Sequence, residues 1–232
     1  MASRADTLAS SRLRRLARRD PERAEPQAER CELCSQRIGP DHRHLLDISN
    51  RELKCTCRPC SLLFDREAAS QGQYRLVPDR RLRLDDFELS DVSWEELRLP
   101  VDMAFLFRSS REDRVMAFYP SPMGATESLL QLDAWARLER DNPVLDSMRS
   151  DVEALLINRV KGARRHWLVP IDDCYRLVGL IRTGWRGLTG GREVWEAIGR
   201  FFEDLDARAR PEHSPPTHPT PDPPAASAAE RS

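Results

Sequence analysis

Residues 31–60 read CELCSQRIGPDHRHLLDISNRELKCTCRPC and contain two Cys-x-x-Cys pairs. The first pair is Cys31 and Cys34, and the second is Cys57 and Cys60, with 22 residues between the pairs. Because each such turn aims two sulfurs the same way, two turns folded together can close a tetrahedral shell of four thiolates around one metal ion. The sequence therefore predicts a four-cysteine metal site near the start of the chain.

Three further side chains in this stretch are candidates for the site. Cys55 lies two residues before the second pair, and we assign it to the returning strand as a small semi-buried side chain. Its alternatives are exchange with Cys57 and a role as a redox-sensitive thiol beside a low-pKa thiolate. His42 and His44 lie close to the first pair and could replace a thiol, but four cysteines with matched spacing are the better ligands.

Thiolate spacing alone does not fix the metal. A closed four-thiolate zinc site has no open coordination position, so it acts by folding a small domain or by presenting a surface. The same four sulfurs could hold iron, either as a single rubredoxin-like atom or as an Fe–S cluster, and the module would then be an electron carrier. We expect zinc (Zn) and keep iron (Fe) as the alternative.

The residues around the cysteines predict a compact four-cysteine metal-binding module over residues 31–72. Residues 44–48 alternate in the manner of a strand, Ser49-Asn50 is turn chemistry, and residues 51–56 return to the second pair. Residues 61–70 then indicate a short helix. The order of knuckle, hairpin, knuckle and helix is typical of a treble-clef-like arrangement, with a plain zinc ribbon as the alternative.

The following residues, 73–208, predict an α+β domain. Alternating apolar residues indicate strands first, and a helical periodicity follows. We expect a mainly antiparallel sheet with strands at 74–77, 81–84, 87–89, 103–107, 115–119, 152–157 and 166–169, and a loop at 120–124. We expect helices that start at Asp133, at Pro170 and after Gly190-Gly191, the last two with apolar stripes wide enough to pack a core. The fold class is therefore α+β, a small four-cysteine module followed by a sheet domain with C-terminal helices.

Composition limits the classes of function. The chain has 232 residues, a net charge of -1 and 32% charged residues, so no strong field steers it to nucleic acid or anionic lipid. No run of about 18 apolar residues exists, so no membrane span is expected. Residues 1–30 and 209–232 read as disordered tails, the first basic and the second Pro-rich. With no recognisable export signal we expect a cytoplasmic protein, in which clustered cysteines bind metal and do not form disulfides.

Signatures of known catalytic sites are absent from the sequence. We find no Gly-rich phosphate loop, no nucleophile elbow and no His-Glu-x-x-His. Cys174 has Asp172, Asp173 and His166 near it, but its spacing from Ile171 places it on the apolar face of a helix, where a Cys is usually inert. The two aspartates suit the positive N-terminal end of that helix. We therefore expect a binding protein without catalytic residues, and not an enzyme.

Four motifs carry a resemblance to one family. They are the cysteine-rich run at 31–64, FYPSPMGATES at 118–128, VPIDDCYRLVG at 169–179, and GGREVW at 190–195 followed by Phe201-Phe202. Together they resemble an uncharacterised family of high-GC bacteria that is encoded in gene clusters for uptake nickel–iron (NiFe) hydrogenases. That family is a domain of unknown function with an N-terminal zinc-ribbon-like module. The resemblance covers about residues 30–206 and brings no assigned activity.

This resemblance implies an accessory or assembly adaptor that docks onto a hydrogenase subunit or maturation factor. The alternative is a small iron-binding electron-transfer protein that serves the same enzyme. A third, unrelated interpretation is a zinc-ribbon nucleic-acid-binding protein. The near-zero net charge and the lack of interleaved basic and aromatic residues in the module argue against that third interpretation.

Overall fold

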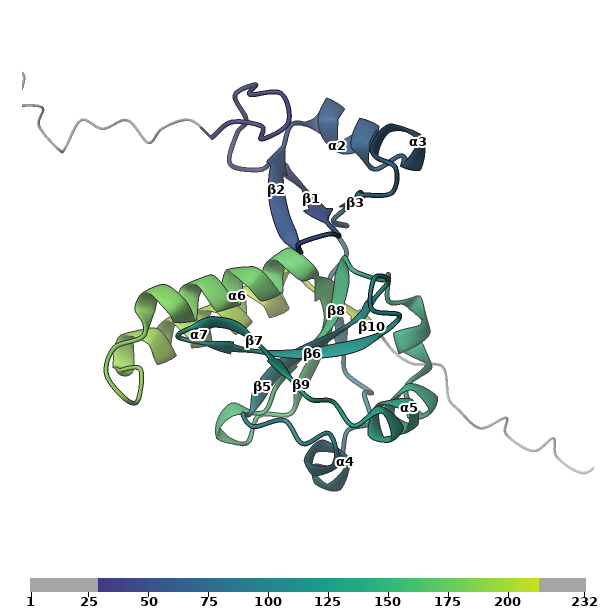
Figure 1. Cartoon of the computed structure of the whole chain (residues 1–232). Coiled ribbons are helices and arrows are strands. Elements are labelled where there is room, and N and C mark those ends of the chain that lie inside the picture. Colours follow the sequence, from purple (N-terminus) through teal and green to yellow (C-terminus); the bar gives the residue numbers. More distant parts are fainter. Residues whose placement is uncertain (1–28, 213–232) are drawn as a thin grey trace, which may run out of the picture.

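The protein, seen in a computed structural model that describes residues 29–212, consists of a small module and a larger sheet domain (Figure 1). Most of the predicted basic tail and most of the predicted Pro-rich tail lie outside the described residues, but Glu29 and Arg30 are described, and Arg30 forms a β-bridge with Arg37. The module has a three-stranded sheet in the order β2-β1-β3, and the domain has a seven-stranded sheet in the order β10-β4-β9-β8-β5-β6-β7. Figure 1 shows the turn of the β1–β2 hairpin beside the start of helix α6.

The module is a knuckle, a hairpin and two short helices. Strand β1 (Arg43–Asp47) pairs antiparallel with β2 (Glu52–Thr56) and with β3 (Tyr74–Leu76). Helix α2 (Arg58–Phe64) starts directly after β2, and α3 (Glu67–Ser70) follows it. The second Cys pair therefore lies at the start of a helix, which is the treble-clef-like order and not a second free knuckle.

Two details of the module differ from expectation. The single helix predicted over 61–70 is two helices, with a break after α2 at Asp65. The Asp65 carboxylate accepts a hydrogen bond of 2.8 Å from the Leu76 N–H, so the break is tied to β3. Strand β3 itself, which we placed in the following domain, pairs with β1, so the module's sheet extends to Leu76.

The larger domain confirms the predicted α+β class with a mainly antiparallel sheet and C-terminal helices. All neighbouring strands of its sheet are antiparallel except β10 and β4. The strands are β4 (Leu82–Leu84), β5 (Met103–Ser109), β6 (Arg114–Ser121), β7 (Gly124–Ser128), β8 (Glu153–Asn158), β9 (Arg165–Pro170) and β10 (Arg210–Glu212). The helices are α4 (Asp91–Glu96), α5 (Leu132–Asp141), α6 (Ile171–Gly184) and α7 (Arg192–Arg208), with short 3-10 turns at Pro143–Ser147 and Val160–Gly162.

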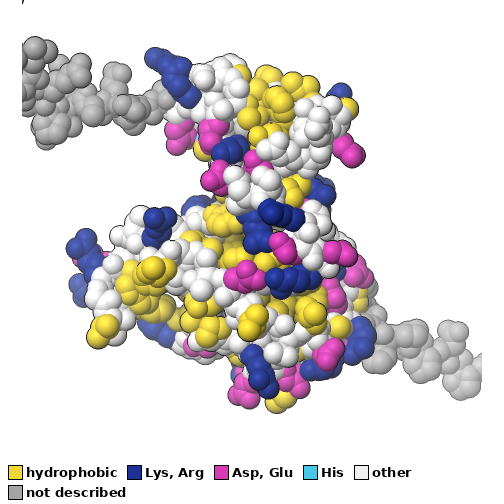
Figure 2. All heavy atoms as spheres, in the orientation of Figure 1, with side chains coloured by type: hydrophobic (Ala, Val, Ile, Leu, Met, Phe, Trp, Pro, Cys, Tyr) yellow, Lys and Arg dark blue, Asp and Glu magenta, His cyan; other side chains and the backbone are white. Residues whose placement is uncertain are grey.

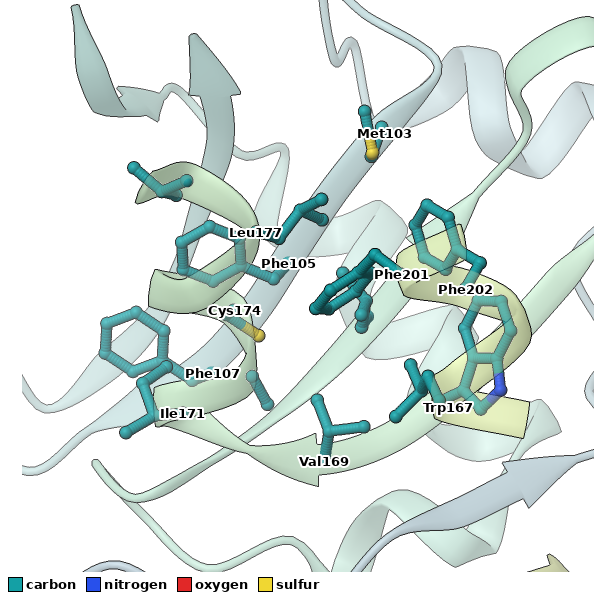
Figure 3. Packing of buried hydrophobic residues seen from close by; sticks show 14 of the residues in the cluster. Met103, Phe105, Phe107, Trp167, Val169, Ile171, Cys174, Leu177, Phe201 and Phe202 are labelled. Carbon is teal, nitrogen blue, oxygen red and sulfur yellow. The ribbon is translucent and has the colours of Figure 1, made fainter. Parts of the chain in front are cut away.

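Alternation along the central strands gives the sheet two buried faces, each covered by helices. On β5, Phe105 and Phe107 face α6 and α7, whereas Leu106 faces the layer of α4 and α5. Figure 3 shows Phe105 and Phe107 next to Cys174 of α6, with Phe201 and Phe202 of α7 farther to the right in the view. The apolar cluster on the α6 and α7 side also contains Leu46 and Val77. The module therefore shares a core with the domain.

Residues 87–89 do not form the expected strand. The Glu88 N–H donates to Asn142 Oδ1 at 2.7 Å, and Asn142 Nδ2 donates to the Glu88 carbonyl at 3.0 Å. The Asn142 side chain thus forms hydrogen bonds with the Glu88 N–H and carbonyl, which a neighbouring strand would form in a sheet. Phe87 and Leu89 still pack on the α4 and α5 side, which explains their alternating pattern.

The segment 120–124, predicted as a loop, is a tight turn between two strands. Strand β6 continues to Ser121 and β7 starts at Gly124, whose φ of 119° favours glycine. The Ser121 hydroxyl donates to the Gly124 carbonyl at 3.0 Å and accepts from the Met123 N–H at 3.1 Å. Both Pro120 and Ser121 sit inside the β6–β7 ladder, so the segment is part of the sheet.

The structure also corrects two expectations, one about the C-terminal end of the sheet domain and one about the start of helix α5. Arg210–Glu212, placed in the Pro-rich tail by composition, form β10 beside β4. This strand contributes no large apolar side chain, so the sequence pattern gave no sign of it. Asp133 lies in the first turn of α5, whose N-cap is Gln131. The predicted helices that follow Pro170 and Gly191 are confirmed.

Candidate metal centre

The four predicted ligands lie together at one end of the module. The Sγ atoms of Cys31, Cys34, Cys57 and Cys60, here called the four-thiol cluster, all lie within 4.8 Å of one another. The Cys34 and Cys57 sulfurs are 3.6 Å apart. Four sulfurs around a metal at about 2.3 Å form a tetrahedron with edges of about 3.8 Å. The arrangement therefore fits one tetrahedral ion, zinc included.

Two local turns aim these sulfurs. In the knuckle, the Ser35 N–H donates to the Cys31 carbonyl at 2.7 Å, and Ser35 has a φ of 62° that closes the turn. In the second pair, Cys57 is the N-cap of α2 and Cys60 lies in its first turn. Pro59 favours this helix start because its fixed φ suits the first turn and its missing N–H would be unpaired there.

The backbone around Cys31 favours the thiolate form of its side chain. Burial raises the pKa of the Cys31 thiol, but the backbone N–H groups of Cys57, Cys34 and Leu33 outweigh it and lower the pKa to about 6. Burial and the neighbouring thiols raise the pKa of Cys60. A bound cation would supply the positive charge that lets the remaining thiols ionise.

Cys55 and the two histidines do not join this cluster. Cys55 lies in β2, where its N–H donates to Glu32 Oε1 at 2.8 Å and its carbonyl accepts from the Glu32 N–H at 2.9 Å. Burial, with the charges of Glu32 and Glu29, raises the pKa of its thiol. Its sulfur lies instead near His42 and His44, in a second group of metal-ligating side chains.

Cys174 is enclosed in the core between α6 and the sheet, as Figure 3 shows. Burial, with the charges of Asp173 and Asp172, raises the pKa of its thiol well above the ordinary value. His166 lies on the opposite face of the sheet, where the centre of its ring is 4.7 Å from that of Phe87. The sheet therefore separates the His166 imidazole from this sulfur.

We expect Cys174→Ala to lower the free energy of unfolding by only about 1–2 kcal/mol, because a buried Cys acts as a small hydrophobe. Metal content and partner binding should not change. Urea unfolding and metal analysis of the purified variant check this. Loss of partner binding at an unchanged melting temperature would instead indicate a functional thiol.

The fold and the four-thiol cluster define an α+β protein whose N-terminal cysteines fit a zinc module. The chain belongs to DUF5947, a family of unknown function, whose sequence profile matches residues 30–209. The match spans the module and the sheet domain together, so the two units are a joint feature of the family. No curated protein and no solved structure matches the chain. Within residues 29–212, no helix combines the length and the apolar character needed to cross a membrane.

Proposed function

We propose that this protein is a cytoplasmic accessory or assembly adaptor for a nickel–iron hydrogenase, with a structural zinc ion in the four-thiol cluster. The observation that supports the proposal is that four sulfurs lie close enough to complete a tetrahedral shell around one ion, which would leave no position for a substrate. Such a site serves by holding a surface in shape. The partner, a hydrogenase subunit or maturation factor, follows from the family resemblance of the sequence motifs.

A surface suited to a partner lies on the same module. Leu62 and Leu63 of α2 are 54% and 52% exposed. Figure 2 shows hydrophobic side chains gathered on the module over α2. Exposed large apolar side chains next to one another are typical of protein contact surfaces. Because Cys57 and Cys60 lie at the start of α2, a metal ion there would fix the helix that presents these leucines.

Affinity capture from the native host tests the proposal. We expect a hydrogenase subunit or maturation factor to co-purify with the full chain, and deletion of the gene to lower the amount of active hydrogenase without abolishing transcription of the operon. Replacing both Leu62 and Leu63 with Ser should abolish capture. The matched control is Leu188→Ser, a 99% exposed leucine between α6 and α7, which should leave capture unchanged.

Other results would contradict the adaptor. Normal hydrogenase activity in the deletion strain, together with no hydrogenase-related protein in the captured material, would reject the adaptor. Metal content and a visible spectrum distinguish the electron-carrier alternative. A colourless zinc protein supports the adaptor, whereas visible charge-transfer bands from iron would support the carrier.

A further inference from the structure

A second group of metal-ligating side chains lies beside the four-thiol cluster. It consists of His42, His44 and Cys55, here called the His–Cys group, and one ligand atom of each lies within 4.8 Å of the other two. Cys55 is directly opposite His44 in the β1–β2 pair. His42 is two residues before His44, and residues two apart along an extended chain point to the same side. The hairpin register therefore gathers all three side chains.

Each imidazole of the His–Cys group is held through Nδ1. His42 Nδ1 lies 2.9 Å from the Gly39 carbonyl and 3.2 Å from the Glu29 carboxylate. His44 Nδ1 lies 2.9 Å from Asp172 Oδ2. Because these oxygens only accept hydrogen bonds, Nδ1 is the donor in each ring, and Nε2 is the nitrogen that would bind a metal ion. Metal-binding histidines are oriented by contacts of this kind.

The second nitrogen of His42 has no partner of its own. The His42 side chain is only 8% exposed, and its Nε2 is buried without a hydrogen-bond partner among the described residues. A buried polar atom left without a partner costs about 1–3 kcal/mol. A cation bound at Nε2 would remove that cost, because it uses the lone pair directly.

We propose that His42, His44 and Cys55 bind a second divalent transition-metal ion, with zinc as the first candidate. Two imidazole nitrogens and one thiolate are ligand types that zinc takes. Three protein ligands leave a fourth coordination position free, in contrast to the four-thiol cluster. His42 and His44 line a cleft of about 800 Å³ between the module and α6. The cleft would therefore give water or a small ligand a route toward the fourth position past the two histidines.

The contacts around the second site are also favourable for a cation. The carboxylates of Glu29 and Asp172 lie against the two imidazoles and offset the positive charge of the ion. Asp172 belongs to the first turn of α6, so the same site joins the module to the sheet domain. Asp172 is a positioning residue in this arrangement, because it acts through His44.

Metal stoichiometry of the full-length protein tests this site without any assay of the proposed function. After dialysis against excess zinc and removal of loosely bound ion, the wild type should retain two equivalents. Cys55→Ser and His44→Gln should each retain one. Asp172→Asn should lower the affinity for the second zinc ion by about 10–100-fold, as expected for loss of a carboxylate that holds a metal-binding histidine. Cys174→Ala is the matched thiol control and should retain two.

Cobalt substitution provides a second, spectroscopic readout. Cobalt added to protein that holds one zinc should give thiolate charge-transfer absorption, and Cys55→Ser should abolish that absorption. One equivalent of zinc in the wild type, with no cobalt–thiolate band, would overturn the proposal. So would the loss of both equivalents in a folded Cys55→Ser variant, because Cys55 would then belong to the four-thiol cluster.

Discussion

Cys57→Ser is expected to release the ion of the four-thiol cluster and to unfold residues 31–70. Within residues 29–212, the apolar neighbours that pack against the cysteines at this site are Leu33, Ile38 and Phe64, each partly buried. So few side chains provide little burial, and a structural zinc site supplies on the order of 10 kcal/mol to such a module. The zinc content of the variant and hydrogen exchange of its module amides measure the effect. Ser at Cys31, Cys34 or Cys60 should act in the same way.

Cys55→Ser is the control for this prediction, since it removes a neighbouring thiol and leaves the four-thiol cluster intact. It should keep the module folded and one zinc bound. If Cys55→Ser unfolded the module and Cys57→Ser did not, the ligand assignment would be wrong.

Loss of the module should also weaken the sheet domain. Leu46 of β1 and Val77 after β3 belong to the apolar cluster under α6 and α7. The Arg51 guanidinium lies 5.7 Å from the ring centre of Phe118 on β6 and donates to the Met116 sulfur. Unfolding of the module exposes these contacts to water. A chelator should therefore lower the melting temperature of the domain as well, and an unchanged value would show that the two units fold independently.

The cysteine cluster and the central strands were predictable because each has a local signal. Matched Cys-x-x-Cys spacing indicates the ligands, and the unbroken apolar run that contains Phe105, Leu106 and Phe107 indicates a strand that is buried on both faces. The sequence also contains enough information to predict the His–Cys group. A hairpin centred on Ser49-Asn50 pairs residues whose numbers add to 99, which places His44 opposite Cys55, as observed.

Other features depend on contacts between distant residues and leave no local trace. The Asp172 carboxylate that orients His44 comes from 128 residues further along the chain. Asn142, which replaces a strand partner for Glu88, is separated from it by 54 residues. Single-sequence patterns report the periodicity of burial, but they do not report which polar side chain reaches a given backbone group.

Asp173→Ala is expected to lower the free energy of unfolding by about 3–5 kcal/mol. The Asp173 side chain is 4% exposed and accepts a hydrogen bond of 2.6 Å from Arg81 Nε. Arg208 lies 3.6 Å from the same carboxylate, and Arg176 lies 4.0 Å from it. After the substitution, Asp204 still pairs with Arg176 at 2.9 Å and with Arg208 at 3.2 Å. The cost therefore falls mainly on the Arg81 guanidinium, which loses its buried partner.

The control is a second carboxylate, Asp79, that contacts the same Arg81 guanidinium. Arg81 also contacts Asp79 at 2.6 Å, but the Asp79 side chain is 78% exposed, so Asp79→Ala should cost less than about 1 kcal/mol. The Arg81 carbonyl accepts from the Arg210 N–H at 3.0 Å, so Asp173→Ala should also increase hydrogen exchange in β10. Urea unfolding of both variants measures the difference, and zinc content should stay unchanged in each. Equal losses in the two variants would mean that burial of the carboxylate does not determine the strength of this contact.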